Sequence, residues 1–478
     1  MLSATASGSW ARDTVAGDRR PPLKRTIVLI VLTAVLGGVS AYIFGRDDGN
    51  PGTPSRPVAT GPAGDDGTRA AGSLAELDPD VLRCLAAPGP GNLRGPREDR
   101  PTTLAALARR VERLRGLRYE RLPRPKVLGK RELDRRVRRL SLQSYSAAEA
   151  RADERLLVAL GALDPDANLR AEIEELLTSQ VAGFYVPESG ELVVGRFAGE
   201  LGPLEEVTLA HELEHALADQ NFGLPVDDRA PPAEADAQLA ALALVEGDAT
   251  LTMQRYALAH LTVGEQLSLA GHPTVAGATA ALEGVPHYLR QMFQFPYLGG
   301  LAFACTLYRE GGWAAVDRAY DRPPSTSAQV LFPERYLGDE RAAEVPDIAA
   351  PDGWVVVRRG AFGAAPLLWL FQAPGGDPGM ALARAKRKVA EWGGGEYALL
   401  ERGGDHAVAL VLVDRPGGGE LCRALVQWYA RAFPEAHRRG GPGLLLFEGD
   451  QDAAIACRGT EVRLGIGPSP AVARSLTG

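Results

Sequence analysis

Apolar residues recur every three or four positions through most of the chain before residue 350, and this spacing predicts helices. A strand broken by prolines is expected near 118–128, and two short strands flank a Pro-Glu-Ser-Gly turn within 181–195. Beyond residue 350 the pattern changes to short strands with two helices among them. The helices expected from the spacing are 104–117, 131–142, 172–179, 204–221, 233–260, 285–292, 300–309, 313–320, 381–392 and 419–433.

The change of pattern near residue 350 predicts two folded parts and an α+β fold class. We expect a helix-rich domain at 76–348 and a C-terminal α+β domain at 352–478. The chain has 478 residues, of which 45% are hydrophobic, so both domains have enough apolar material for a core.

The N-terminal region contains an uncharged, apolar run of nineteen residues, 26–44. As a helix it would be roughly 28 Å long, which predicts a transmembrane signal-anchor. The basic residues within 1–25 predict that this end stays in the cytoplasm and that the rest of the chain is extracytoplasmic. A signal peptide cleaved near Val39–Ala41, giving a secreted protein, is the alternative. Residues 45–75 are rich in Gly, Pro, Ser, Thr and Asp, as in a flexible linker.

The net charge of −7 is modest for this length and gives no reason to expect a nucleic-acid partner. Within 94–139 the chain is strongly basic, and its arginines interleave with leucines. This arrangement favours a solvated helical face, and contact with anionic lipid or substrate is the alternative.

Four cysteines are present, and none has the CxxC spacing of a metal or redox site. Outside the cytoplasm an even count allows two disulfides. The pairs that we expect are Cys422 with Cys457 and Cys84 with Cys305, and small buried thiols are the alternative.

The stretch TLAHELEHALADQ, residues 208–220, contains the pattern H-E-x-x-H. Residues four apart lie on one face of a helix, so His211 and His215 can both present a ring nitrogen to one metal ion. Glu212 is rotated by about 100° from His211 and can reach a water molecule beside that ion. An ordinary amphipathic helix without metal is the alternative, although by chance the pattern arises in roughly one such chain in a hundred.

A second helix offers a third ligand, which catalytic zinc sites commonly have. Glu246 lies in an apolar helical stretch, where a carboxylate is costly unless it is paired or binds a metal. An ion pair with an arginine is the alternative for Glu246. Thr250, one turn on, is expected to hydrogen bond a ligand histidine, and Asp219 is expected to orient one. Asp236 is a weaker candidate ligand.

The sequences HELEH and VEGDA together resemble the gluzincin metallopeptidases, and the wider chain resembles a group of bacterial membrane-anchored zincins. The similarity covers about 114–337 and includes VAGFYVPESGELVV, HALADQNF, FPYLGG and GGWAAVDRAYDRPPSTSAQVLFPERY. It implies a zincin-like catalytic domain within 76–348. Where the group tends to have Glu and His, this chain has Ala328 and Phe332, which puts catalytic activity in question but not metal binding.

The resemblance implies hydrolysis of a peptide or protein substrate, with one Zn²⁺ per chain as the cofactor. Glu212 would be the general base. Tyr297 is the candidate donor to the oxyanion, and Tyr320 and Arg322 are alternatives. A role for Tyr297 in the core or in a loop is an equally strong alternative. The strand Glu191–Gly195 is the expected edge at which an extended peptide would pair.

Two other hypotheses remain. The protein can be a metal-binding but catalytically impaired zincin that acts as a binding or scaffold module in the cell envelope. Retention of Glu212 disfavours this reading, whereas Ala328 and Phe332 favour it. Alternatively, no metal binds and the two helices simply pack.

Overall fold

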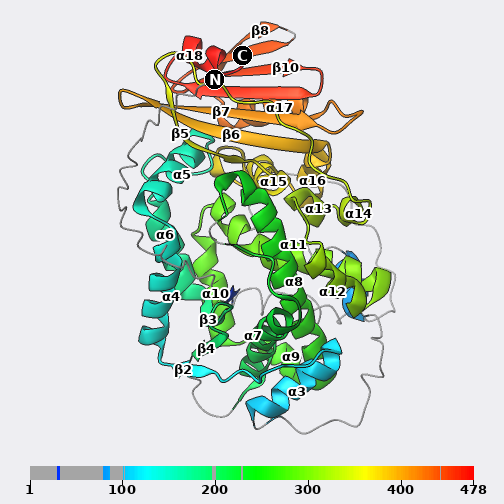
Figure 1. Ribbon diagram of the computed structural model, residues 1–478. Coiled ribbons are helices and arrows are strands. Elements are labelled where there is room, and N and C mark those ends of the chain that lie inside the picture. Colours follow the sequence, from blue (N-terminus) through cyan, green and yellow to red (C-terminus); the bar gives the residue numbers. More distant parts are fainter. Residues whose placement is uncertain are drawn as a thin grey trace, which may run out of the picture.

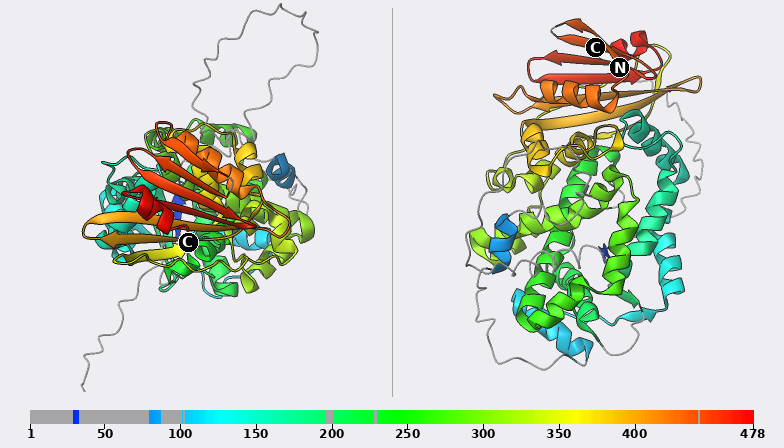
Figure 2. Two further views of the ribbon diagram at one scale, coloured as in Figure 1. Left: turned by 90° about the horizontal axis from the view of Figure 1, so that it is seen from above. Right: turned by 180° about the vertical axis from the view of Figure 1, so that it is seen from behind.

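The computed structural model describes residues 29–32, 79–86, 101, 103–195, 201–227, 230–441 and 443–478. Figure 1 shows a helical part built around a small sheet, with a larger sheet stacked on one end of it. Figure 2 shows the same stacking from behind. This mixture of helices and sheets confirms the α+β fold class.

The smaller sheet has four strands in the order β1-β3-β4-β2. The predicted hairpin is confirmed, because β3 (Val181–Val186) and β4 (Glu191–Gly195) pair antiparallel around the turn. Strand β2 (Lys126–Leu128) pairs parallel with β4, and β1 (Leu29–Leu32) pairs antiparallel with β3. The expectation that Glu191–Gly195 is an edge strand is therefore wrong, since β4 has a partner on both sides.

The predicted transmembrane segment 26–44 is described only at Leu29–Leu32, and these four residues form a strand and not the expected helix. Among the described residues, no helix has both the length and the apolar composition that crossing a bilayer requires. The rest of that segment, the basic N-terminus 1–25 and the linker 45–75 lie outside the described residues. The membrane anchor stays a prediction.

Three long helices form the centre of the helical part: α7 (Pro203–Phe222), α8 (Ala235–His260) and α11 (His287–Gly311). Helix α7 begins with a proline at its first turn, where the missing N–H costs nothing, and two glutamates there complement the helix dipole. Helix α8 is buried along most of its length, which is why its sequence is apolar on all sides.

The two helices expected at 285–292 and 300–309 are one continuous helix, α11, with Pro296 inside it. The segment between the two expected helices contains Pro296 and Gly299, which disfavour a helix interior. The packing of α11 against α8 outweighs that local cost. At their crossing, a Cβ added to Gly247 would lie 2.2 Å from the carbonyl oxygen of Gly300, so only glycine allows this approach.

The helix α3 (Leu104–Arg115) lies beside both α7 and α8. Thr103 caps its first turn by accepting a hydrogen bond from the backbone N–H of Ala106. The other helices of this part are α2 (Pro79–Ala86), α4 (Lys130–Ser144), α5 (Ala147–Ala159), α6 (Leu169–Gln180), α9 (Val263–Ala270), α10 (Pro273–Glu283), α12 (Trp313–Asp321), α13 (Ser327–Leu331) and α14 (Pro333–Leu337), with a short 3₁₀ turn at Pro232–Glu234.

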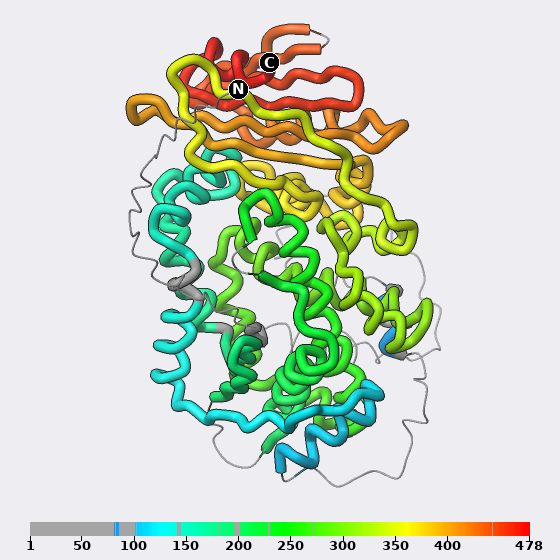
Figure 3. Tube along the Cα trace, viewed as in Figure 1, coloured from blue at the N-terminus to red at the C-terminus, as the bar shows by residue number. Residues whose placement is uncertain are grey.

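The C-terminal part is a seven-stranded antiparallel sheet in the order β5-β6-β7-β11-β10-β9-β8. Between α14 and β5 the chain runs across this sheet (Figure 3), where Ile348 and Trp354 are buried. The strands are β5 (Val355–Ala361), β6 (Trp392–Arg402), β7 (Asp405–Asp414), β8 (His437–Gly441), β9 (Leu444–Glu448), β10 (Asp452–Arg458) and β11 (Glu461–Gly467), and the helices are α15 (Ala364–Gln372), α16 (Leu382–Val389), α17 (Leu421–Ala432) and α18 (Pro470–Ser475), with a short 3₁₀ turn at Pro374–Gly376.

The two parts share one apolar core. Trp369 of α15 packs edge-on against the rings of Tyr288 and Phe295 on α11, at centroid distances of 5.3 and 5.8 Å. Buried residues continue from the centre of the helical part into the sheet without a polar layer between them. The chain therefore changes pattern near residue 350 without forming a flexible joint there.

Both expected disulfides are confirmed. Cys84 bonds to Cys305, which ties α2 to α11. Cys422 bonds to Cys457, which ties α17 to β10 across the C-terminal part. Such bonds persist in oxidising compartments, so they agree with an extracytoplasmic location without testing it.

Candidate metal site

Three of the predicted ligands lie together between α7 and α8. The Nε2 atoms of His211 and His215 lie 3.2 and 3.4 Å from the Oε2 atom of Glu246. One donor atom from each residue can be chosen so that all three lie within 4.8 Å of one another. Each of the three side chains is about 1% exposed. This buried group can hold a metal ion.

The spacing and chemistry of these donors fit a metal cation. Two ligands of one tetrahedral zinc ion, each at about 2.0–2.1 Å, are roughly 3.3 Å apart. Burial lowers the pKa of His211, although its hydrogen bond with Glu246 opposes this, so the imidazole is neutral and able to bind a metal. Burial raises the pKa of Glu246, but His215 and His211 lower it by more, and the carboxylate is ionised. The donor set is thus two imidazoles and one carboxylate.

Glu212 lies beside this group, under the small sheet. Its side chain is buried, and a Cβ added to Gly183 of β3 would lie only 3.6 Å from its Cγ. The helix directs Glu212 toward β3 and the two histidines toward α8, as expected for neighbours about 100° apart. A carboxylate in this position borders the same space as the ligand group without being one of its members.

Tyr297 reaches the site from α11. Its ring lies nearly parallel to that of His211, with a centroid distance of 6.3 Å. Burial raises the pKa of Tyr297 well above its usual value, and the charges of Glu246 and Glu212 and a hydrogen bond to Glu246 raise it further. The phenol therefore keeps its proton and is a hydrogen-bond donor at the site.

Among the described residues, neither Asp219 nor Thr250 hydrogen bonds to a ligand histidine, although an electrostatic interaction links Asp219 to His215. Asp219 accepts a hydrogen bond of 2.7 Å from the hydroxyl of Tyr185 on β3. The hydroxyl of Thr250 is buried and has no hydrogen-bond partner among the described residues. Thr250 is one turn beyond Glu246, about 6 Å further along α8. Within the described chain, the Nδ1 atoms of both ligand histidines also have no hydrogen-bond partner.

Asp236 is not part of the ligand group. Its carboxylate accepts a hydrogen bond of 3.0 Å from the backbone N–H of Ser327, at the start of α13. Burial raises the pKa of Asp236 to about 6. It precedes Glu246 by ten residues, which is about 15 Å along α8.

The alternatives to Tyr297 have other partners. The hydroxyl of Tyr320 donates a hydrogen bond of 3.0 Å to Asp248, which faces away from Glu246 on α8. The side chain of Arg322 is 55% exposed and pairs with Asp339 at 3.2 Å. Of the three candidate donors to an oxyanion, Tyr297 is the one that the fold brings to the ligand group.

Ala328 and Phe332, the two positions at which this chain departs from the zincin group, lie on and directly after α13, and Phe332 ends that helix. Ala328 follows Ser327, whose backbone N–H donates to Asp236 near the start of α8, ten residues before Glu246. The ring of Phe332 lies under the guanidinium of Arg335, 4.8 Å from its centroid. Neither residue is a member of the ligand group.

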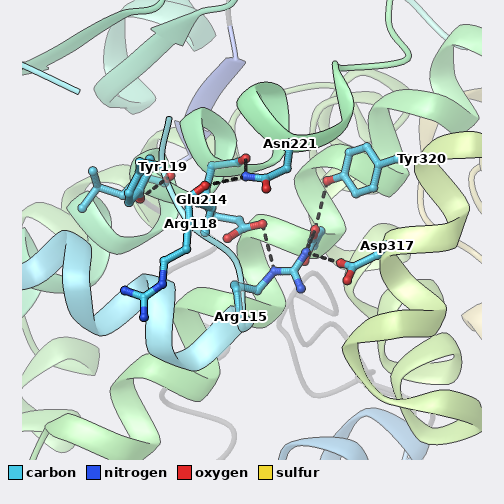
Figure 4. A network of polar contacts seen from close by, with 10 residues as sticks. Arg115, Arg118, Tyr119, Glu214, Asn221, Asp317 and Tyr320 are labelled. Atoms are coloured by element: carbon cyan, nitrogen blue, oxygen red, sulfur yellow. Dashed lines mark hydrogen bonds and ion pairs between the residues drawn. The ribbon is translucent and has the colours of Figure 1, made fainter. Parts of the chain in front are cut away.

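An ion cluster that we did not predict lies on the other side of the ligand helices (Figure 4). It joins Arg115 to Glu214 and Asp248, which are the second acidic residue of HELEH and the acidic residue after VEG. Arg115 and Arg110 are buried, so the expectation of a solvated basic face is wrong for these two residues. Glu214 and Asp248 are two further carboxylates in apolar helices, and burying them requires counter-charges. This requirement was the signal in the sequence that could have predicted the ion cluster.

Comparison with known proteins finds no matching family model, no similar curated protein and no similar solved structure. The family resemblance therefore rests on the sequence motifs quoted above. Independently of family, the site is a buried group of two imidazoles and a carboxylate that can hold a metal ion, with a second carboxylate and a protonated phenol beside it.

Proposed function

We propose that this protein is a zinc-dependent metalloendopeptidase of the gluzincin type, anchored by residues 26–44 with its catalytic domain outside the cytoplasm. The observation that carries the proposal is the buried group of His211, His215 and Glu246 with Glu212 one residue from a ligand. Two imidazoles and one carboxylate are a common donor set of catalytic zinc, which leaves a position open for water or substrate.

The residues have distinct roles in peptide hydrolysis. A zinc ion held by the three ligands would polarise the scissile carbonyl and make a water molecule acidic enough to attack it. Glu212 accepts the proton of that water and then delivers it to the leaving nitrogen. The phenol of Tyr297 donates a hydrogen bond to the oxygen on which negative charge develops. Burial of all these groups strengthens their electrostatic effects.

The substrate peptide would pair with β3, and not with β4 as the sequence suggested. Strand β3 lies against Glu212 through Gly183, and β4 covers its other side. The outer side of β3 is paired with β1 in this structure. An extended peptide can add to a sheet edge by main-chain hydrogen bonds, so it would take the place of β1 beside the ligand group.

The test is hydrolysis of an unfolded protein by the zinc-loaded chain and by Glu212→Gln. Loss of the general base is expected to lower kcat by roughly 10²- to 10⁴-fold while zinc content stays the same. Glu205→Gln, in the first turn of the same helix, is the matched control and should retain activity. Hydrolysis that survives in Glu212→Gln would contradict the proposed mechanism.

A second candidate, the catalytically impaired zincin that acts as a scaffold, is favoured by one observation. His211, Glu212, His215 and Glu246 are each at most 1% exposed, so the ligand group is closed in this structure. The same assay separates the two functions. A parent chain that binds zinc but cleaves no substrate would support the scaffold and exclude the peptidase.

A further inference from the structure

We infer that Arg115 is a positioning residue for the metal site, because it holds α7 and α8 at the separation that the ligands need. The inference rests on the proposed function only in requiring that the site binds a metal. Arg115 is the last residue of α3 and is 1% exposed. It touches no ligand, and it acts through carboxylates that neighbour the ligands in sequence.

One guanidinium links three helices (Figure 4). Its Nε donates a hydrogen bond of 2.9 Å to Glu214 on α7. Its Nη2 donates hydrogen bonds of 2.9 Å to Asp248 on α8 and to Asp317 on α12. The ring of Trp313 lies 4.2 Å from the guanidinium carbon and fixes its plane. The planar fork of arginine fits such a bridge, whereas a lysine ammonium would not span it.

The bridged carboxylates stand next to the ligands but point elsewhere. Glu214 precedes His215 by one residue, a rotation of about 100° on the helix. Asp248 follows Glu246 by two residues, a rotation of about 200°. The ligands therefore face one another on one side of the α7–α8 contact, and Arg115 joins the two helices on another side.

Without the guanidinium, two buried carboxylates from α7 and α8 would face each other with no counter-charge. The cost of burying these two polar groups without their shared hydrogen-bond donor would move the helices apart. The distances of 3.2 and 3.4 Å between Glu246 and the histidines would then increase. The chain just after α3 contacts α7 a second time, because the hydroxyl of Tyr119 donates a hydrogen bond of 2.9 Å to the carbonyl of Leu213.

The fold supplies a matched control in Arg110, one turn earlier on α3. Arg110 is 4% exposed and also joins α7 to α8, by donating hydrogen bonds to Glu206 at 3.2 Å and to the hydroxyl of Tyr256 at 3.3 Å. Glu206 precedes the first ligand histidine by five residues, and Tyr256 follows Glu246 by ten. Loss of this link weakens the same helix packing at a distance from the ligands.

The experiment compares Arg115→Lys with Arg110→Lys in the full chain. Zinc affinity is measured by competition with a chromophoric chelator, thermal stability by calorimetry, and ligand geometry by the absorption spectrum of bound Co²⁺. We expect Arg115→Lys to bind zinc roughly 10- to 100-fold more weakly and to alter the Co²⁺ spectrum. Arg110→Lys should keep the parent affinity within about threefold and the parent spectrum, even if it loses as much thermal stability.

Glu214→Gln keeps the test decisive if Arg115→Lys does not fold, because it removes the α7 end of the link and preserves the side-chain shape. It is expected to weaken zinc binding and alter the spectrum in the same way. Parent-like affinity and spectrum in the folded Arg115 or Glu214 variant would overturn the inference, as would an equal loss of affinity in Arg110→Lys. These results leave the peptidase proposal standing, whereas a parent chain that binds no metal overturns both.

Discussion

Tyr297 is the side chain of α11 that lies beside the ligand group, and the proposed function makes it the donor to the oxyanion. It is buried against His211 and hydrogen bonds to Glu246, and its raised pKa keeps it a donor at neutral pH. We expect Tyr297→Phe to lower kcat by roughly 10²-fold, the typical cost of one donor to an oxyanion. Steady-state kinetics with zinc content as the control checks this. A loss of zinc that parallels the loss of activity would instead assign the phenol to orienting Glu246.

His287 makes the stability of the fold dependent on pH. Burial and the neighbouring Arg290 guanidinium lower the pKa of His287 to about 4. In the unfolded chain it titrates near 6.5, so the unfolded state binds a proton that the folded state excludes. The stability that this neutral histidine contributes is complete above pH 6.5 and is lost as the pH falls toward 4.

Between pH 8 and pH 5 this single group should lower the free energy of unfolding by about 2 kcal/mol. Because glutamine does not titrate, the free energy of unfolding of His287→Gln should fall by about 2 kcal/mol less than that of the parent between pH 8 and pH 5. Denaturant unfolding of both chains at the two pH values measures the difference. Equal pH dependence in the two chains would show that the folded chain binds the proton at His287 as readily as the unfolded one.

At the scale of single residues, sequence spacing was sufficient for the ligands. His211 and His215 are one turn apart on one helix, and that alone places both rings on one face. Glu246 followed from the cost of a carboxylate in an apolar helix. The partners of Asp219 and Thr250 depend on which element packs opposite, and spacing within one helix carries no information about that.

At the scale of elements, the contact between α8 and α11 brings Tyr297 to the ligands. Gly247→Ala would place its Cβ 2.2 Å from the backbone oxygen of Gly300, so the helices must separate. We expect a loss of about 2 to 3 kcal/mol in the free energy of unfolding, as for other overpacked sites. Gly277→Ala on α10, whose Cβ would meet nothing within 4 Å, should be neutral or stabilising by up to about 1 kcal/mol. Similar results for both variants in thermal or denaturant unfolding would exclude a tight crossing.

Most helices and strands could be predicted from periodicity. The errors share one cause, which is contact with elements that are distant in the sequence. The hairpin 181–195 and helices α7 and α8 were expected within two residues of their observed ends. Helix α11 was expected as two helices, and it is continuous because it packs closely on α8, where Gly300 is necessary. The position of β4 inside the sheet depends on β2, which is distant in sequence and only three residues long.

At the scale of the whole molecule, one disulfide ties α17 to the sheet of the C-terminal part. Cys422 and Cys457 are 35 residues apart, and closing a loop of that size stabilises by about 3 to 4 kcal/mol through chain entropy. We expect the double variant Cys422→Ser/Cys457→Ser to lose about that amount, as measured by denaturant unfolding of the oxidised parent and the variant. An unchanged unfolding midpoint, or two free thiols in the non-reduced parent, would contradict this prediction.

The relation between the two parts of the molecule was only partly predictable. Their boundary near residue 350 followed from the change to alternating strands. Their shared core did not, because the contact of Trp369 with Tyr288 and Phe295 joins residues that are more than seventy positions apart. The C-terminal part is therefore positioned to stabilise α11, and through it the helix crossing beside the metal site.

Metal content of the full chain tests the central claim most directly. The chain is purified without chelator, and zinc per chain is measured beside His211→Ala, Glu246→Ala and the control His437→Ala, an exposed histidine on β8. We expect about one zinc ion per chain in the parent and the control, and far less in the two ligand variants. A folded parent that binds no zinc even when the metal is supplied would contradict the central claim, and α7 and α8 would then be two packed helices that carry a buried ion pair.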